Sequence, residues 1–144
     1  MPPTEARLCE ACRLLDRQTG RIFRRSSVYR TESWGFKAPD FLNQIVALET
    51  ELDPWSVLAS VLRIEEQLGR TRLPVTDGQR YASRTIDIDI LFYDHWIVNT
   101  PRLQIPHPRI VGRRFVLTGL QEIMPDYIHP TEKKRVLTLY NMCK

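Results

Sequence analysis

Apolar side chains recur at helical spacing in several stretches of the chain. The first stretch predicts an amphipathic helix over residues 5–18, which Thr4 caps and Gly20 ends. Its apolar stripe consists of Leu8, Ala11, Cys12 and Leu15. Asp53 followed by Pro54 begins a second helix, which runs to Gly69. Its predicted stripe consists of Leu58, Val61, Leu62 and Leu68. Two further helices are predicted over residues 111–124 and 131–140, with a break at Pro125.

Other stretches alternate between polar and apolar positions, as strands do. Residues 21–29 predict a strand of mixed polarity, and residues 41–50 predict a central strand because both of its faces are largely apolar. The clearest alternation lies in residues 83–93, where Asp87 and Asp89 share one face and isoleucines occupy the other. Turn-forming residues separate these stretches and predict loops over residues 31–40 and 73–81.

The order of the predicted elements bounds the fold. Helix, strand, strand, helix and strand follow one another, and residues 94–96 then predict a turn between the last strand and short extended pieces at 97–98 and 103–109. This order favours a mixed or antiparallel sheet with helices packed on it, which is an α+β sandwich. No repeat or linker divides the chain, so we expect a single domain over residues 1–144.

Composition narrows the class of partner. The 144 residues are 42% hydrophobic and 26% charged, which is ordinary for a globular protein. The chain contains no apolar run of about 20 residues and no signal-peptide pattern, so we expect a cytoplasmic location and no membrane partner. The formal charge of +4 suits an acidic partner. Because no nucleic-acid-binding signature is present, the sequence favours a small phosphorylated molecule over nucleic acid.

The two aspartates of residues 83–93 suggest a metal site. Residues two apart on a strand lie about 6.6 Å apart along it, which lets both carboxylates reach bound cations, and Mg²⁺ prefers such oxygen ligands. Four arginines precede them within fifteen residues and would bind phosphate oxygens: Arg70, Arg72, Arg80 and Arg84. The alternative is a polar strand face on which the aspartates pair with these arginines as surface ion pairs.

The three cysteines suggest packing rather than chemistry. Cys9 and Cys12 have the spacing of metal and redox motifs, but no second cysteine pair or histidine cluster accompanies them. On a helix the two residues lie on one face, where free cysteine is a common small core residue.

Four motifs follow one another along the chain, which are Phe41-Leu-Asn43, Arg63-Ile-Glu65 with Gly69-Arg70, Arg84-Thr-Ile-Asp87-Ile-Asp89, and Ile105-Pro-His107-Pro-Arg109 with Arg113 and Phe115. Taken together they resemble those of the 6-hydroxymethyl-7,8-dihydropterin pyrophosphokinase (HPPK) family of folate biosynthesis. The resemblance covers nearly the whole chain. It implies a ferredoxin-like α+β sandwich and a transferase that moves the terminal diphosphate of ATP to the pterin hydroxymethyl group, releasing AMP.

The resemblance also implies roles for individual residues. Asp87 and Asp89 would hold two Mg²⁺ ions, and Arg70, Arg80 and Arg84 would hold and enclose the phosphates. The implied ATP-binding residues are Glu65, Arg70, Arg84, His107 and Arg113, although Glu65 alone is equally consistent with a solvated helix carboxylate. The implied pterin-binding residues are Phe41, Asn43, Tyr81 and Phe115. Phe115 is also consistent with a core position at the start of its helix. Tyr81 and Ser83 stand where relatives carry tryptophan and proline.

The family resemblance predicts a strand ahead of the first helix, whereas this sequence begins at that helix. We therefore expect that this strand belongs to an upstream segment missing from the sequence, or that the sheet is rearranged, or that a dimer contact supplies the pairing. Unless a dimer contact replaces the strand, we expect a monomer. Three functions remain open at this point: a working pyrophosphokinase, an impaired nucleotide- or pterin-binding remnant, and an interaction domain that retains only the fold. The joint presence of the aspartates, arginines, His107 and Asn43 disfavours the third.

Overall fold

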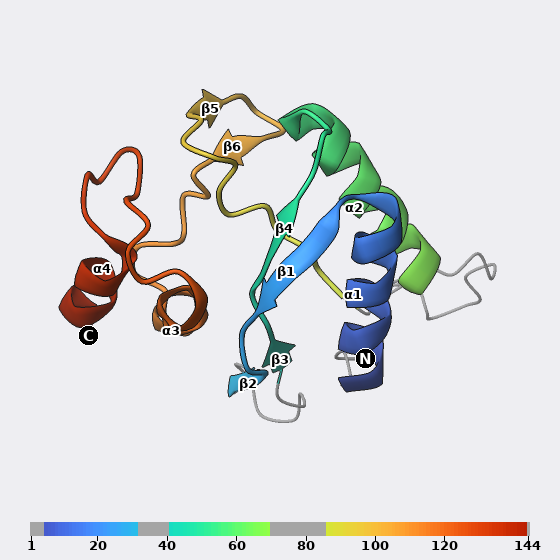
Figure 1. Cartoon of the computed structure of the whole chain (residues 1–144), viewed down its shortest axis with the longest axis horizontal. Coiled ribbons are helices and arrows are strands. Elements are labelled where there is room, and N and C mark those ends of the chain that lie inside the picture. The colour runs from blue at the N-terminus through green and yellow to red at the C-terminus, as the bar shows by residue number, and fades with distance from the viewer. Residues whose placement is uncertain (1–4, 32–40, 70–85, 144) are drawn as a thin grey trace, which may run out of the picture. The chain divides into compact units, whose positions relative to one another are not determined.

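The computed structural model describes residues 5–31, 41–69 and 86–143. Figure 1 shows the elements, which are α1 (Glu5–Gln18), β1 (Arg21–Arg25), β2 (Tyr29–Thr31), β3 (Phe41–Asn43), β4 (Val46–Glu49), α2 (Pro54–Leu68), β5 (Val98–Asn99), β6 (Gln104–Ile105), α3 (Arg114–Ile123) and α4 (Val136–Met142). The described strands form three two-stranded sheets, which are β1 with β4, β2 with β3, and β5 with β6. Helices combined with small sheets make this an α+β protein, as the order of elements predicted.

The chain divides into two compact units. The first unit comprises Met1–Ile22, Arg30–Leu42 and Leu48–Ile88, and the second unit comprises Phe23–Tyr29, Asn43–Ala47 and Asp89–Lys144. The last passage from the first unit to the second therefore falls between Ile88 and Asp89, inside the segment of the two aspartates.

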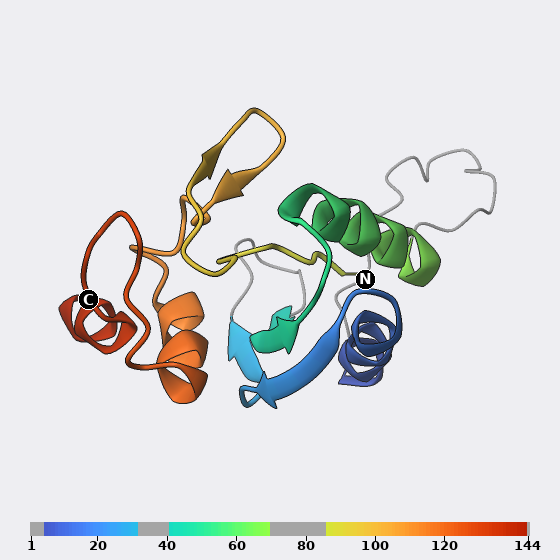
Figure 2. The same cartoon turned by 45° about the horizontal axis from the view of Figure 1, so that its top comes forward.

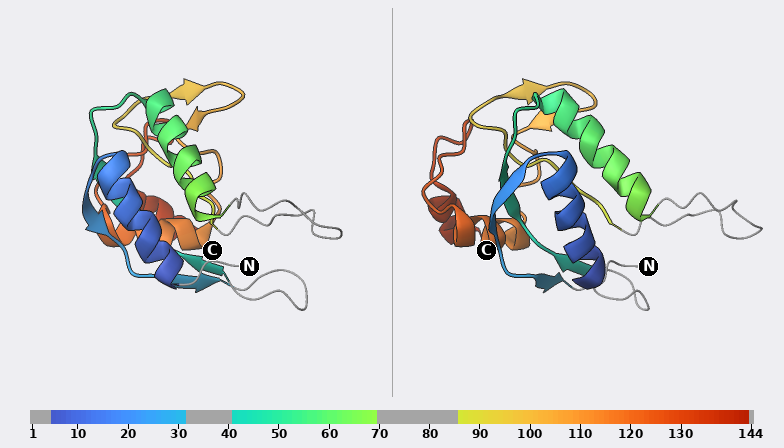
Figure 3. Two further views of the ribbon diagram at one scale, coloured as in Figure 1. Left: turned by 90° about the vertical axis from the view of Figure 1, so that its right-hand side faces the viewer. Right: turned by 45° about the vertical axis from the view of Figure 1, so that its right-hand side comes forward.

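Two helices form the core of the first unit. Figures 1 and 3 show α1 and α2 side by side. The predicted stripe of α1 is confirmed, because its buried residues are Leu8, Ala11, Cys12 and Leu15. Between the helices the hydroxyls of Thr19 and Ser60 form a buried hydrogen bond of 2.6 Å. At the end of α2, the Arg7 guanidinium donates to the carbonyl of Leu68. Such a bond satisfies one of the terminal carbonyls that a helix leaves without an internal partner.

Local signals set both ends of α2, as predicted. The Asp53 carboxylate accepts a hydrogen bond of 2.8 Å from the amide of Ser56, and Pro54 occupies the first turn. The amide of Gly69 closes the other end by donating to the Glu65 carbonyl at 2.9 Å. The predicted apolar stripe was partly wrong, since Leu62 is 42% exposed. The apolar residues that α2 buries are Val57, Val61, Ile64 and Leu68, which follow one another at helical spacing on a neighbouring stripe.

Helices α3 and α4 pack together in the second unit (Figure 1). Their core consists of Ile110, Val116, Leu117, Leu120, Val136 and Leu139, all of which are buried. Gly119 of α3 permits a close approach to Ile45, because a Cβ atom built on Gly119 would lie 2.4 Å from Ile45 Cγ1. The helix therefore needs a residue without a side chain where it meets Ile45.

The second unit also contains a hairpin, which β5 and β6 form. The two strands are antiparallel, with Val98 opposite Ile105 and Asn99 opposite Gln104, and Figure 2 shows the loop that joins them. Val98, Leu103 and Ile105 are buried. The preceding turn occurs at Asp94 and His95 as predicted, and Asp94 adopts a positive φ of 48°.

Three predicted strands need correction. Residues 21–29 form β1 and the start of β2 with a break between them, because the Ser26 hydroxyl accepts from the Ile45 amide and the Ser27 amide donates to Glu122 of α3. Residues 41–50 likewise divide into β3 and β4, and neither is central, since each has one neighbouring strand among the described residues. Residues 86–93, the described part of the predicted aspartate strand, form no strand ladder at all.

Two predicted helices begin later than expected. Helix α3 starts at Arg114 rather than 111, because the amide of Arg113 bonds to the Ile110 carbonyl in a preceding turn. Helix α4 starts at Val136 rather than 131. Before it, the Lys133 amide donates to the His129 carbonyl and the His129 amide donates to the Lys134 carbonyl. This turn uses a positive φ of 59° at Lys133, which is incompatible with a right-handed helix there.

Candidate active site

Part of the predicted site lies outside the described residues. Arg70, Arg80, Tyr81 and Arg84 all belong to residues 70–85, as does the predicted loop over 73–81. The predicted loop over residues 31–40 falls outside as well, except for Thr31 at the end of β2. Phe41 contributes backbone to β3, and its side chain is also outside the described part. The expectations for these residues remain predictions.

In the described part of residues 83–93, the predicted alternation of aspartates and isoleucines appears as an alternation of burial. Ile86 is buried and Ile88 and Ile90 are half-buried, whereas Asp87 and Asp89 are exposed. The isoleucines therefore account for the alternation even though no ladder forms. Their burial leaves both carboxylates accessible to solvent and to ligands.

A buried carboxylate on α2 binds the backbone of this segment. Glu65 is 8% exposed, and its Oε2 accepts a hydrogen bond of 2.6 Å from the amide of Ile88. The solvated-carboxylate interpretation of Glu65 is thus wrong. Burial of a carboxylate is costly unless it is paired or hydrogen-bonded, and this bond supplies one such partner.

In the second unit, the backbone of His107 binds the continuation of the same segment. Its amide donates to the Leu91 carbonyl at 2.9 Å. Partial burial lowers the pKa of the His107 imidazole, the charge of Asp89 opposes this, and the guanidinium groups of Arg109 and Arg113 add to the lowering. The structure therefore brings His107 and three charged residues into one electrostatic neighbourhood.

The tautomer of His107 follows from its local hydrogen bond. Its Nδ1 accepts a hydrogen bond of 3.1 Å from the amide of Arg109, so in the neutral ring Nε2 carries the proton. Since the pKa is lowered, the neutral form prevails at neutral pH. The imidazole thus offers one N–H donor, which suits the oxygen of a phosphate or a ribose.

Arg113 and Phe115 lie together at the start of α3. The Arg113 guanidinium carbon is 5.4 Å from the centroid of the Phe115 ring, within the range of a cation–π contact. Phe115 is half-buried and packs against the core of the second unit. The ring is therefore partly a core residue, and its remaining surface is accessible. Asn43, at the end of β3, is half-buried.

The two aspartates fit the chemistry of Mg²⁺. Proteins commonly bind this ion through one or two carboxylates, while water and substrate phosphates supply the other oxygens. Over the described ranges, no group of three or more histidine, cysteine, aspartate or glutamate side chains is placed to hold a metal by itself. A nucleotide would thus complete the coordination that two aspartates leave open.

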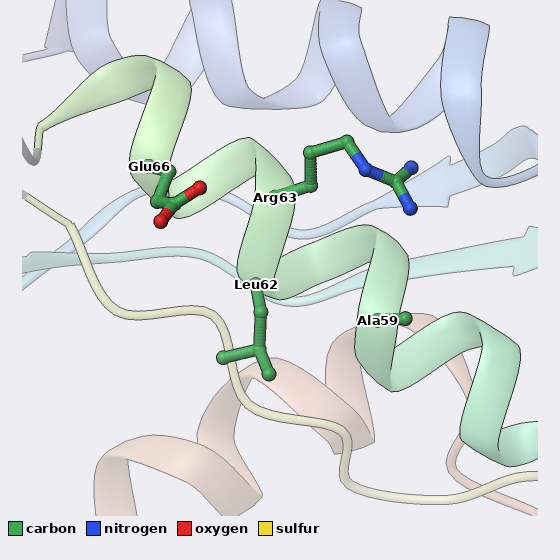
Figure 4. Close-up of a pocket in the computed structure, with 4 residues that line it drawn as sticks. All are labelled: Ala59, Leu62, Arg63 and Glu66. Atoms are coloured by element: carbon green, nitrogen blue, oxygen red, sulfur yellow. The ribbon is translucent and has the colours of Figure 1, made fainter.

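Two other features carry no chemistry of this kind. Cys12 is buried in α1 as predicted, whereas Cys9 is exposed, and neither is in a disulfide. A concavity of about 440 Å³ lies on α2 and is lined by Ala59, Leu62, Arg63 and Glu66. Figure 4 shows that these four side chains fan out from one helix rather than converging. This arrangement does not enclose a ligand.

Arg109 is the functional candidate that sequence reasoning did not assign. Its amide fixes the acceptor nitrogen of His107, and its charge contributes to lowering the pKa of that ring. The signal was present in the sequence, because Arg109 ends the Pro-His-Pro-Arg motif two residues after the histidine.

Comparison with known proteins identifies the family of this chain. Residues 2–125 match the model of the family described as 7,8-dihydro-6-hydroxymethylpterin-pyrophosphokinase (HPPK). A 2-amino-4-hydroxy-6-hydroxymethyldihydropteridine pyrophosphokinase of Porphyromonas gingivalis is 41% identical over 125 residues, covering 85% of this chain and 83% of that protein. An enzyme of the same name from Synechocystis is 39% identical over 118 residues, covering 82% of this chain and 58% of that protein.

A plant relative carries a similar region within a longer protein. The mitochondrial folate synthesis bifunctional protein of Pisum sativum is 40% identical over 116 residues, which is 80% of this chain and 22% of the plant protein. In the described part of the present chain, no helix has the length and apolar character needed to cross a bilayer.

Proposed function

The chain belongs to the 7,8-dihydro-6-hydroxymethylpterin-pyrophosphokinase family, and from this premise we propose that it transfers the terminal diphosphate of ATP to 6-hydroxymethyl-7,8-dihydropterin, releasing AMP. The main structural support is the pair of exposed carboxylates, Asp87 and Asp89, on either side of a backbone amide that Glu65 binds. This feature connects the motif of the two aspartates to a hydrogen bond from α2.

Asp87 and Asp89 would hold Mg²⁺, and we propose two ions as the resemblance implies. Bound to the phosphates, the ions would neutralise charge on the attacking and leaving oxygens. The protein has little covalent work to do in such a transfer, so its residues act mainly by positioning and by electrostatic stabilisation.

The nucleotide would be held by charged and donor groups of this chain. Arg70 and Arg84 would bind phosphate oxygens through their guanidinium forks, and Arg80 would help exclude water from the transferring group. His107 would donate its Nε2 proton to a nucleotide oxygen, which its neutral state and fixed tautomer support. Arg113 would add positive charge near the same nucleotide.

The pterin would be bound by one amide and several flat rings. The side chain of Asn43 both donates and accepts, which matches the mixed polar edge of a pterin. Phe41, Tyr81 and Phe115 would pack against the faces of the ring. For Phe115 the accessible part of the half-buried ring would make this contact, while the remainder stays against the core.

The proposal extends to the architecture, the oligomeric state and the location of the protein. We propose that the elements complete a ferredoxin-like sandwich in one domain over residues 1–144. A monomeric state and a cytoplasmic location remain predictions of the sequence.

The test is to identify the nucleotide produced when the protein is mixed with MgATP and 6-hydroxymethyl-7,8-dihydropterin. We expect AMP in amounts equal to the pterin diphosphate, with none in a control without pterin. Pterin-dependent ADP would contradict diphosphate transfer, because it indicates transfer of a single phosphoryl group. Binding of both substrates without any product would instead support an impaired remnant.

A further inference from the structure

Two adjacent glutamates of α2 have opposite environments. Glu65 is 8% exposed, whereas Glu66 is exposed and lines the surface concavity of Figure 4. A glutamate is rarely buried without a strong partner. The burial of Glu65 therefore points to a specific contact that the surface glutamate does not make.

The contact that the structure describes for Glu65 is with the backbone of a distant residue. Oε2 of Glu65 accepts from the Ile88 amide at 2.6 Å, across 23 residues of sequence. A hydrogen bond to an ionised acceptor is roughly twice as strong as a neutral one. Ile88 is flanked by Asp87 and Asp89, and Ile86 is buried two residues earlier. The bond thus fixes the middle of the segment that presents the two carboxylates.

We infer that Glu65 is a positioning residue, which holds the Ile88 amide so that Asp87 and Asp89 are preorganised for a divalent cation. This role rests on the proposed function of the two aspartates. It differs from direct contact with ATP, because its effect reaches the cation through the backbone. Removing a group that orients metal ligands without touching the metal typically changes the metal affinity by about 10- to 100-fold.

The hydrogen bond between Glu65 and Ile88 matters because no described strand holds this segment by a ladder. In a sheet, neighbouring strands would hold each amide of the segment, but residues 86–93 form no ladder among the described residues. In the first unit, the carboxylate of Glu65 takes the place of such a neighbour at Ile88. Removing it leaves a half-buried amide without this acceptor, which favours local opening.

The first experiment measures hydrogen exchange of the Ile88 amide by NMR in the ligand-free full chain. Glu65→Ala should raise the exchange rate at least 10-fold. Glu65→Gln keeps an acceptor oxygen without the charge, so its exchange rate should lie between those of Glu65→Ala and the unaltered protein. The matched control Glu66→Gln should leave the rate unchanged. Equal Ile88 exchange in Glu65→Ala and the unaltered protein would overturn the inference. If Glu65→Ala does not fold, a Glu65→Gln rate equal to that of the unaltered protein would overturn it.

The second experiment measures the consequence for a cation without using turnover. Mn²⁺ alone is titrated while paramagnetic broadening of the Asp87 to Asp89 amides is followed. Glu65→Ala should raise the Mn²⁺ concentration for half-maximal broadening by about 10-fold, with partial rescue in Glu65→Gln. An unchanged titration would show that Glu65 has no positioning role towards a cation.

Turnover separates the inference from the proposed function. In the AMP assay, Glu65→Gln should raise the Mg²⁺ concentration for half-maximal rate while leaving KM for the pterin unchanged. If the variant instead has a higher KM for ATP at saturating Mg²⁺ and normal Mn²⁺ broadening, Glu65 contacts the nucleotide directly and is not a positioning residue. If the unaltered protein forms no AMP, the proposed function fails, and the exchange and Mn²⁺ experiments still decide the role of Glu65.

Discussion

The β5–β6 hairpin and residues 86–93 are both extended, but they are held in different ways. In the hairpin, backbone pairs with backbone, and Val98 and Ile105 are buried opposite each other. Residues 86–93 form no ladder with the other described residues, and the contacts described for their backbone include a bond from the Ile88 amide to Glu65 within the first unit and one from the His107 amide to the Leu91 carbonyl within the second. Backbone pairing stabilises an element as a whole, whereas isolated bonds fix chosen positions and leave the residues between them available.

This difference predicts that changes in the hairpin alter stability and that changes in residues 86–93 alter chemistry. The largest effect should come from Ile105→Ala, because Ile105 is 2% exposed and its removal leaves a cavity. The free energy of unfolding should fall by about 2–5 kcal/mol in denaturant titrations. Gln104→Ala, at the exposed neighbouring position of β6, should change it by less than about 0.5 kcal/mol. Similar losses in both variants would refute the comparison.

Asp89→Ala should show the opposite pattern. Its exposed side chain contributes little to stability, but loss of a metal-binding carboxylate should reduce Mg²⁺-dependent AMP formation on the order of 100-fold or more. The thermal midpoint should stay close to that of the unaltered protein. Asp126→Ala, which removes an exposed ion pair with Arg135, serves as the control and should retain full activity. Unchanged turnover in Asp89→Ala would rule out the metal role of that residue.

Asn43→Ala should give a smaller and more selective effect. Loss of hydrogen bonds to one ligand should weaken pterin binding by about 10-fold while ATP binding changes little. Calorimetry with each ligand separately measures the two affinities. Equal losses for pterin and ATP would mean that Asn43 supports the site in general rather than binding the pterin.

The smallest effect concerns the far end of the segment, where the ring centroids of Phe92 and His129 lie 5.5 Å apart and the ring planes are nearly perpendicular. Burial lowers the pKa of His129 and Glu132 opposes this, while Nδ1 accepts from the amides of Thr131 and Glu132. Below the unfolded pKa of about 6.5, the unfolded chain binds the proton more readily than the folded chain, so stability should fall as the pH falls through that region.

Urea titrations at pH 7.5 and 5.5 test this expectation. The unaltered protein should lose more stability on acidification than His129→Gln, which has no titrating ring at this position. An equal loss in both proteins would assign the pH dependence to other groups. In either case the hairpin variants Gln104→Ala and Ile105→Ala should keep the pH dependence of the unaltered protein.

Local signals were sufficient for some elements and insufficient for others. The bounds of α1 and the capped start of α2 followed from the spacing of apolar residues and from Asp53 and Pro54, all within one or two turns. The start of α4 did not, since it depends on paired bonds between His129 and residues 133–134. Helix propensity continues through those residues, so only the turn conformation at Lys133 reveals the boundary.

The site shows the same limit. Alternation correctly separated the isoleucines, which are buried or half-buried, from the aspartates, which are exposed. It could not predict the missing ladder, because a ladder requires a second strand that periodicity in one segment cannot provide. The motif identified Glu65 as a functional candidate, yet the Ile88 amide that donates to it lies 23 residues away. Residue types were thus predictable from sequence, and their contacts depended on long-range packing.

Gly119 has a consequence for attempts to make this protein more heat-resistant. Within a helix, replacing glycine by alanine normally gains about 1 kcal/mol, so α3 is an obvious target for such engineering. Here the added methyl group would lie 2.4 Å from Cγ1 and 3.2 Å from Cβ of Ile45. A β-branched side chain has little rotamer freedom with which to give way. Thermostabilised versions should therefore keep this glycine and improve other positions of the helix.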